Sequence, residues 1–223
     1  MVRHSAKTSS GRLSDDASRR VLSITVAAIG ILATLALMLL IALVVRCTSR
    51  GPVIYKQRRI GVDRRRRSRV SLNSRRATDV GGRPFDIYKF RTMHEAPGAR
   101  QSWAAPGDRR VTAVGRVLRK HRLDELPQLF NVLLGEMNVV GPRPEQPELF
   151  AELRVKIDSY ADRQVVLPGI TGWAQITLGP DRSVDDVRHK LALDLEYIRA
   201  RSTLQDLSIM VRTLPVMLGA TSH

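Results

Sequence analysis

An acidic pair surrounded by basic side chains is the strongest candidate for chemistry in this sequence. Asp124 and Glu125 are adjacent, and the residues before them include Arg116, Arg119, Lys120, His121 and Arg122. Carboxylates among many cations suit a site for phosphate groups and a divalent metal, because Mg²⁺ is typically held by one or two carboxylates plus substrate phosphates. Spacing alone favours a structural alternative, in which the acids cap a helix and complement its dipole. The basic neighbourhood favours the chemical role.

The elements that position this pair follow from hydrophobic periodicity. A helix pattern covers 111–121, and a second helix is predicted from Asp124, its N-cap, to Gly135, its C-terminal cap. Short strands are predicted at 52–56 and 85–90. Further helices are expected around 149–157 and 184–198, and a rigid turn at 141–144. The predicted fold is therefore α/β in type, mostly helical with a few short strands.

An apolar segment near the start of the chain predicts a membrane-embedded helix at 21–46. Residues 21–45 include no charged residue, and these 25 residues would form a helix of about 37 Å, enough to reach across a hydrocarbon core of about 30 Å. Arginines flank both ends, at positions 19, 20, 46 and 50. Because basic flanks favour the cytoplasm, a re-entrant helix is preferred over a spanning one. Gly30 and Thr34 are the candidates for its bend.

The remaining segments suggest how the chain is divided. Residues 1–20 are basic and rich in Ser, which is typical of a disordered arm, and 47–223 are expected to form one compact catalytic domain. The Arg-rich stretch 63–76 is a solvated loop or a contact with anionic lipid headgroups. Residues 204–218 are apolar and lie on the membrane surface or pack in the core.

Composition limits the partners without choosing among them. The net charge of +16 favours binding to anions, and the candidates are nucleic acid, anionic lipid and phosphorylated substrates. Aromatic residues make up only 4% of the chain, which is poor for stacking on single-stranded nucleic acid. Cys47 is the only cysteine, so an intrachain disulfide is excluded.

Six ordered sequence blocks resemble the bacterial sugar transferase family, the monotopic phosphoglycosyl transferases. They are Arg50–Gly61, Pro84–Met93, Leu123–Leu129, Asn138–Glu145, Pro168–Gln175 and Asp194–Ile198. The similarity runs in family order from about residue 21 to 218. An isolated Asp-Glu pair would carry little weight, whereas six blocks in order are specific.

The resemblance implies a two-step transfer of a sugar 1-phosphate from a UDP-sugar to polyprenol (undecaprenyl) phosphate. Asp124 matches the family nucleophile, which forms a phosphosugar-enzyme intermediate as UMP leaves, and Glu125 matches the residue that binds Mg²⁺. The substrate-binding candidates are Arg119, Arg143, Pro142, Pro144, Lys89 and Arg91. For Lys89 and Arg91 the alternative is a strand residue that faces solvent. The implied location is the cytoplasmic face of the bacterial inner membrane, among membrane lipids.

Two departures from the family pattern accompany the resemblance. The family's re-entrant helix bends at a Ser-Pro pair, and the matching positions here are Thr34 and Leu35. The Arg-rich stretch 63–76 is longer than the short turn usual there. The sugar and the glycan pathway are open, and the sequence is compatible with a homodimer. The alternative function is a non-catalytic, membrane-anchored basic protein that binds nucleic acid or anionic lipid, although the matched blocks lead us to expect no nucleic acid partner.

Overall fold

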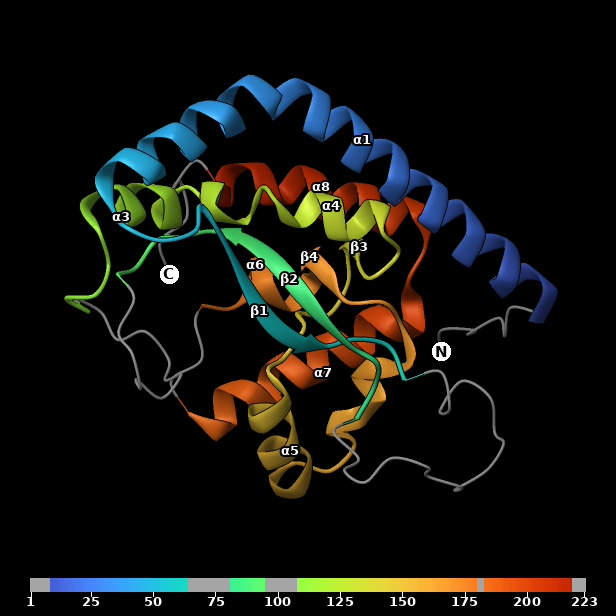
Figure 1. Cartoon of the computed structure of the whole chain (residues 1–223). Coiled ribbons are helices and arrows are strands. Elements are labelled where there is room, and N and C mark those ends of the chain that lie inside the picture. Colours follow the sequence, from blue (N-terminus) through green and yellow to red (C-terminus); the bar gives the residue numbers. More distant parts are fainter. Residues whose placement is uncertain (1–8, 64–80, 95–107, 180–182, 218–223) are drawn as a thin grey trace.

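A long N-terminal helix arches over a set of shorter helices and two small pairs of strands (Figure 1). The computed structural model describes residues 9–63, 81–94, 108–179 and 183–217. Strands β1 (Ile54–Ile60) and β2 (Pro84–Phe90) are antiparallel, and β3 (Asn138–Val140) and β4 (Gly169–Thr171) are parallel. The helices are α1 (Ser9–Thr48), α3 (Ala113–Lys120), η1 (Leu123–Glu125), α4 (Gln128–Leu133), α5 (Pro147–Lys156), η2 (Tyr160–Val165), α6 (Trp173–Thr177), α7 (Val184–Ala200) and α8 (Thr203–Met217). The prediction of a mostly helical fold with few short strands is confirmed.

One face of α1 packs against the domain between Arg19 and Val45. The buried residues recur at helical spacing, namely Arg19, Ser23, Ala27, Met38, Ile41 and Val45. The opposite face exposes large apolar side chains such as Leu32 and Leu39. Within α1, Ser14–Thr48 is long and apolar enough to cross a membrane. One face of the helix is therefore part of the protein core, and the other face is an exposed apolar surface.

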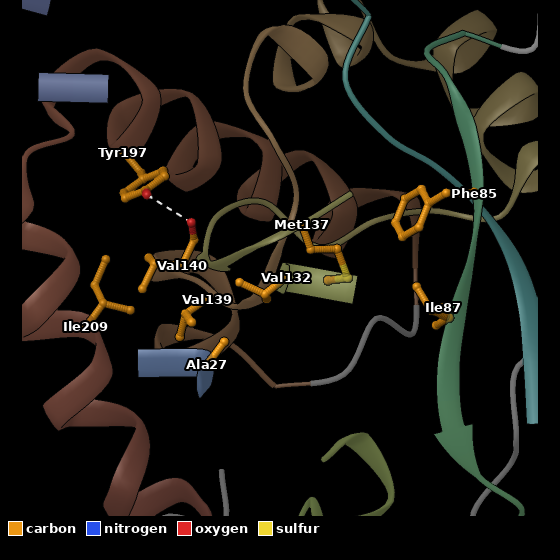
Figure 2. Close-up of a cluster of buried hydrophobic side chains, with 9 residues drawn as sticks. All are labelled: Ala27, Phe85, Ile87, Val132, Met137, Val139, Val140, Tyr197 and Ile209. Carbon is orange, nitrogen blue, oxygen red and sulfur yellow. Dashed lines mark hydrogen bonds between the residues drawn. The ribbon is translucent and has the colours of Figure 1, made fainter. Parts of the chain in front are cut away.

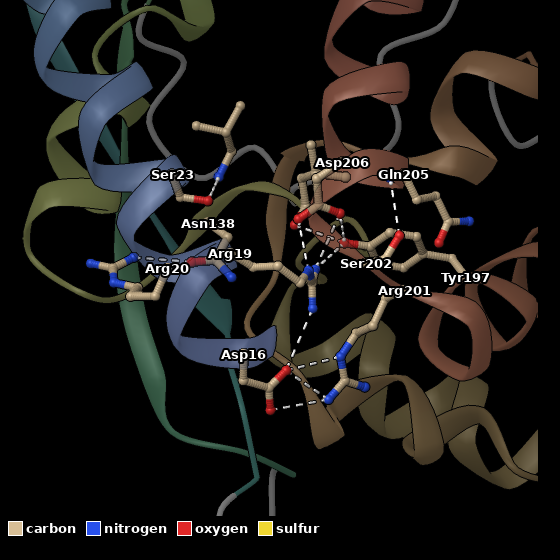
Figure 3. A network of polar contacts seen from close by, with 12 residues as sticks. Asp16, Arg19, Arg20, Ser23, Asn138, Tyr197, Arg201, Ser202, Gln205 and Asp206 are labelled. Atoms are coloured by element: carbon tan, nitrogen blue, oxygen red, sulfur yellow. Dashed lines mark hydrogen bonds and ion pairs between the residues drawn. The ribbon is translucent and has the colours of Figure 1, made fainter. Parts of the chain in front are cut away.

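The start of α1 differs from the prediction of a disordered arm at 1–20. Residues 9–20 form the first turns of α1, and residues 1–8 lie outside the described part. The reason is tertiary contact: Arg19 pairs with Asp206 of α8 at 2.8 Å, and Arg20 Nη1 donates to Asn138 Oδ1 at 3.1 Å (Figure 3). Arginines that suggested a solvated arm in the sequence instead tie the helix to the domain.

The arch of α1 coincides with a local hydrogen bond in the middle of the helix. The Thr34 hydroxyl donates to the Gly30 carbonyl at 2.6 Å. Such bonding by Thr to the preceding turn often bends helices, which fits the curved path in Figure 1. The helix continues without interruption from Ser9 to Thr48. The bend therefore occurs without a break in the helix.

The hydrophobic core includes residues of α1. Figure 2 shows a cluster that comprises Ala27, Phe85, Ile87, Val132, Met137, Val139, Val140, Tyr197 and Ile209. In a second cluster, Met38, Ile41 and Val45 of α1 pack with Phe90 and Leu118. Burial of apolar surface is the main stabilising force in folding, so α1 contributes directly to the stability of the domain.

Helix α8 confirms core packing for one face of the segment 204–218, and its position on a membrane surface stays a prediction. Ile209 is buried in the core, whereas Leu204 and Val211 are exposed. One face of α8 thus packs against the domain and the other adds apolar surface. The Arg-rich stretch 63–76 lies outside the described residues except for Asp63.

Candidate active site

The acidic pair occupies a short 3-10 turn between α3 and α4. Arg122 adopts a left-handed conformation with φ of 57°, which turns the chain sharply after α3 and leads into η1. The prediction that Asp124 caps a helix is wrong, because α4 starts at Gln128, after Pro127. Only 8% of Asp124 and 7% of Glu125 is exposed. The local chain path therefore buries two carboxylates, which is uncommon unless charged or polar partners surround them.

Glu125 is held by two cations from different elements. Its Oε1 lies 2.8 Å from Lys89 Nζ and 2.9 Å from Arg143 Nη2. Burial alone would raise the pKa of Glu125, but Arg143 and Lys89 outweigh it and hold the pKa well below its usual range. Glu125 is therefore ionised throughout the physiological pH range. Lys89 does not face solvent, so that alternative is wrong for this residue.

Asp124 is buried beside this network. Within the described part of the chain it forms no hydrogen bond and no ion pair, although Lys89 and Arg119 are near enough to favour its charged form. Burial, with a further contribution from Glu125, raises the pKa of Asp124 above its ordinary value. The two neighbours thus differ: one carboxylate is fixed by cations, and the other remains available to react.

Arg143 approaches Glu125 from the turn at 141–144. Pro142 and Pro144 fix the backbone on either side of it. Its side chain is 35% exposed, so it can contact a bound molecule while it pairs with Glu125. Lys89, Glu125 and Arg143, three candidates from the sequence, meet in the structure. They lie on a strand, a 3-10 turn and a loop that are distant along the chain, and their roles toward substrate or metal stay predictions.

The remaining two basic candidates bind other parts of the protein. Arg119 Nε donates to the Thr92 hydroxyl at 2.9 Å, at the edge of the acidic pair. Arg91 is buried, and its guanidinium donates to carbonyls that end α1, including Ser49 at 2.7 Å. Arg91 therefore caps α1 and does not face Glu125, contrary to its prediction as a substrate-binding residue. The reading of Arg91 as solvent-facing is equally wrong.

Two residues that complete the site were not singled out in the sequence. Gln175 Oε1 accepts a hydrogen bond from Arg143 Nη1 at 3.1 Å, and its Nε2 is buried without a partner among the described residues. Asn131 joins α4 to β2, because its Nδ2 donates to the Asp86 carbonyl and its Oδ1 accepts from Tyr88 N. Gln175 belongs to the matched block Pro168–Gln175, which was the available signal. Asn131 lies just after the block Leu123–Leu129, and nothing in the sequence marked it as a site residue.

The site as a whole is suited to phosphate chemistry. It combines a buried carboxylate that has no partner among the described residues with cations that are held in place by Glu125. A carboxylate can act as a nucleophile that splits one transfer into two steps. Preorganised cations and N–H donors stabilise charge that develops on a transferring phosphoryl group.

Comparison with known proteins gives consistent matches. The model of the family described as bacterial sugar transferase matches residues 14–220. The chain is 40% identical over 203 residues to a UDP-N-acetylgalactosamine-undecaprenyl-phosphate N-acetylgalactosaminephosphotransferase of Aeromonas hydrophila, covering 90% of this chain and 43% of that protein. It is 39% identical over 210 residues to a UDP-glucose:undecaprenyl-phosphate glucose-1-phosphate transferase of Caulobacter vibrioides, covering 93% of this chain and 72% of that protein. The chain thus spans less than half of the first relative and nearly three quarters of the second.

Proposed function

The chain belongs to the bacterial sugar transferase family, and on this premise we propose that it transfers a sugar 1-phosphate from a UDP-sugar to undecaprenyl phosphate. The observation that carries the proposal is the contrast between two neighbouring carboxylates. Glu125 is fixed by Lys89 and Arg143, whereas Asp124 has no hydrogen bond or ion pair within the described ranges of the chain. The names of the relatives support the class of donor and acceptor. The alternative, a non-catalytic basic protein, gives no reason for this buried arrangement.

Asp124 acts as the nucleophile in the proposed first half-reaction. One of its carboxylate oxygens attacks the β-phosphorus of the UDP-sugar and forms a new P–O bond. The bond from that phosphorus to the bridging oxygen breaks, and UMP leaves with the electron pair. The raised pKa of Asp124 suits this role, because a more basic carboxylate is a stronger nucleophile once it is ionised.

The second half-reaction regenerates the carboxylate. A phosphate oxygen of the lipid attacks the same phosphorus, and the Asp124 oxygen leaves with its electron pair. The product is a polyprenyl diphosphate sugar. In both halves Arg143 and Lys89 lie where they can offset charge on the transferring group.

We place Mg²⁺ at Glu125 in this proposal. Oε1 accepts both close cation contacts, whereas Oε2 has Arg122 Nη1 at 4.0 Å, so one carboxylate oxygen is open to a metal. Among the described residues no group of three or more His, Cys, Asp and Glu side chains could hold a metal. A single carboxylate fits Mg²⁺ that is held chiefly by substrate phosphates, where it would neutralise diphosphate charge.

We base the proposed membrane arrangement on the contacts of α1. Arg19 near its start and Val45 near its end both contact the same domain, through Asp206 and Arg91 respectively. A helix bound at both ends to one body keeps its flanks on one side of a membrane, which supports a re-entrant helix and a domain on the cytoplasmic face of the inner membrane. The site would then lie near the lipid headgroups.

The test is UMP release by the full chain purified in detergent with Mg²⁺. UDP-glucose and UDP-N-acetylgalactosamine are offered separately, with and without undecaprenyl phosphate. We expect sustained release with lipid and at most one UMP per enzyme without it. Asp124→Asn should release no UMP, while the exposed control Asp185→Asn should match the original protein. Equal activity of Asp124→Asn and the original protein would exclude the proposed nucleophile.

A further inference from the structure

The turn that presents Arg143 is held by an uninterrupted run of backbone contacts. Four successive carbonyls each accept a hydrogen bond from outside the turn, and the donors come from three parts of the chain. Pro142 accepts from Gly169 N at 2.9 Å, Arg143 from Arg163 Nη2 at 3.1 Å, and Pro144 and Glu145 from the neighbouring β1 residues Arg59 (Nη1, 3.0 Å) and Ile60 (N, 2.8 Å). Each of these peptide groups therefore has a fixed orientation. Because the backbone of the turn cannot rotate freely, the Cα atom from which the Arg143 side chain extends has a fixed position and direction.

Two of these four donors are buried guanidinium groups. Arg163 makes an ion pair with Asp194 Oδ2 at 2.7 Å, donates to the Tyr160 hydroxyl at 2.8 Å, and stacks over that ring at 5.2 Å. Arg59 donates to Gln57 Oε1 at 2.8 Å. Their side chains are only about a tenth exposed. A planar guanidinium held at several points retains its remaining donor in a fixed direction.

We propose that Arg163 is a positioning residue, which fixes Arg143 toward Glu125 by holding the Arg143 carbonyl, and that Arg59 assists through Pro144. The inference rests on the proposed function, in which Arg143 contacts the transferring phosphate. Neither Arg163 nor Arg59 needs to touch the substrate. Their effect is geometric, and a misplacement of about 1 Å in an active site can reduce the rate by about 10²-fold.

A second cluster of the same composition offers a matched control. Arg19 pairs with Asp206 at 2.8 Å and also donates to the Tyr197 hydroxyl, as Figure 3 shows. Both arginines are thus buried and bound to an aspartate and a tyrosine. Only Arg163 also donates to a residue of the acidic site. The comparison therefore separates loss of a buried cluster from loss of Arg143 positioning.

The experiment compares Arg163→Lys and Arg19→Lys, each alone and combined with Arg143→Ala. Lysine can keep the ion pair with aspartate but lacks the planar fork that also reaches a carbonyl. We measure kcat and KM for UMP release with undecaprenyl phosphate, together with the Tm of every variant. The full chain in detergent is used throughout.

We expect Arg163→Lys alone to lower kcat/KM by about 10²-fold. Combined with Arg143→Ala, it should add less than about twofold, because a residue that acts only through Arg143 has no effect once that side chain is gone. Arg19→Lys should give the same fractional change in both backgrounds. Multiplicative losses for Arg163→Lys and Arg143→Ala would overturn the inference.

A second variant covers the case in which Arg163→Lys does not fold. Arg59→Lys loses the bond to the Pro144 carbonyl and should show the same dependence on Arg143. Multiplicative losses there would also overturn the inference while leaving the proposed function intact. Absence of UMP release by the original protein with a full panel of UDP-sugars would instead reject the proposed function, and the positioning role with it.

Discussion

The contact between Arg19 and Asp206 can be tested by Asp206→Asn, which keeps the side-chain shape and removes the charge. Arg19 is 4% exposed and Asp206 is fully buried. Burial raises the pKa of Asp206, so loss of its own charge removes a desolvation cost, but unlike Asp124 it is directly paired, and the substitution leaves the buried Arg19 cation without its main anionic partner. Breaking such a pair typically costs about 3–5 kcal/mol. Asp16 remains 3.6 Å from Arg19 and is partly exposed, which places the expected loss near the lower value, about 3 kcal/mol.

The assay is thermal unfolding of the purified chain in one detergent. Each kcal/mol lowers the Tm of a domain of about this size by about 2–4 °C, so Asp206→Asn should lower it by about 6–12 °C. The control is Glu152→Gln, which removes an ion pair with Lys156 of 2.6 Å whose side chains are 57% and 51% exposed. An exposed pair contributes less than about 1 kcal/mol, so its Tm should fall by less than about 4 °C. Equal shifts would refute the argument that burial, and not distance, sets the strength of the Arg19 contact.

Three further predictions concern the acidic pair. Asp124→Asn should abolish UMP release yet leave the Tm unchanged or higher, because a raised pKa means that ionised Asp124 destabilises the fold at neutral pH; a lower Tm in calorimetry would contradict this. Glu125→Gln removes the carboxylate shared by Lys89 and Arg143, so UMP release should fall at least about 10²-fold and require more Mg²⁺; an unchanged metal titration would exclude Glu125 as the metal-binding residue. Since only ionised Asp124 attacks, kcat/KM should fall on acidification, and the apparent pKa of this fall should lie above the ordinary aspartate value of about 3.9. The measurement is a pH–rate profile. An apparent pKa at or below the ordinary value would refute the argument that burial raises the pKa of Asp124.

The sequence predicted the elements of the site better than their contacts. Periodicity indicated α3 and β2 closely, and the matched blocks singled out Glu125, Lys89 and Arg143, which meet in the structure. The role of Arg91 could not be read in the same way, because a cation at the end of a strand can face a substrate or a helix end, and only the tertiary position of α1 decides between them.

The N-terminal arm shows a similar limit. Basic composition at 1–20 is typical of disorder, since it provides little apolar surface to bury. That reasoning omits the partner: Asp206 lies 187 residues away along the chain and binds Arg19 in the fold. The local composition of residues 1–20 cannot predict a contact with a residue so far away along the chain. Asp124 failed as a predicted N-cap for a related reason, since its carboxylate belongs to the site and α4 begins after Pro127.

The packing of α1 has a practical consequence for protein production. Deletion of residues 1–48 would not yield a soluble enzyme, because Ala27, Met38, Ile41 and Val45 would be lost from two hydrophobic clusters. A soluble version should keep the helix and replace only outward apolar side chains with polar ones. Leu32, Leu39 and Leu43, each more than half exposed, are the first positions to change.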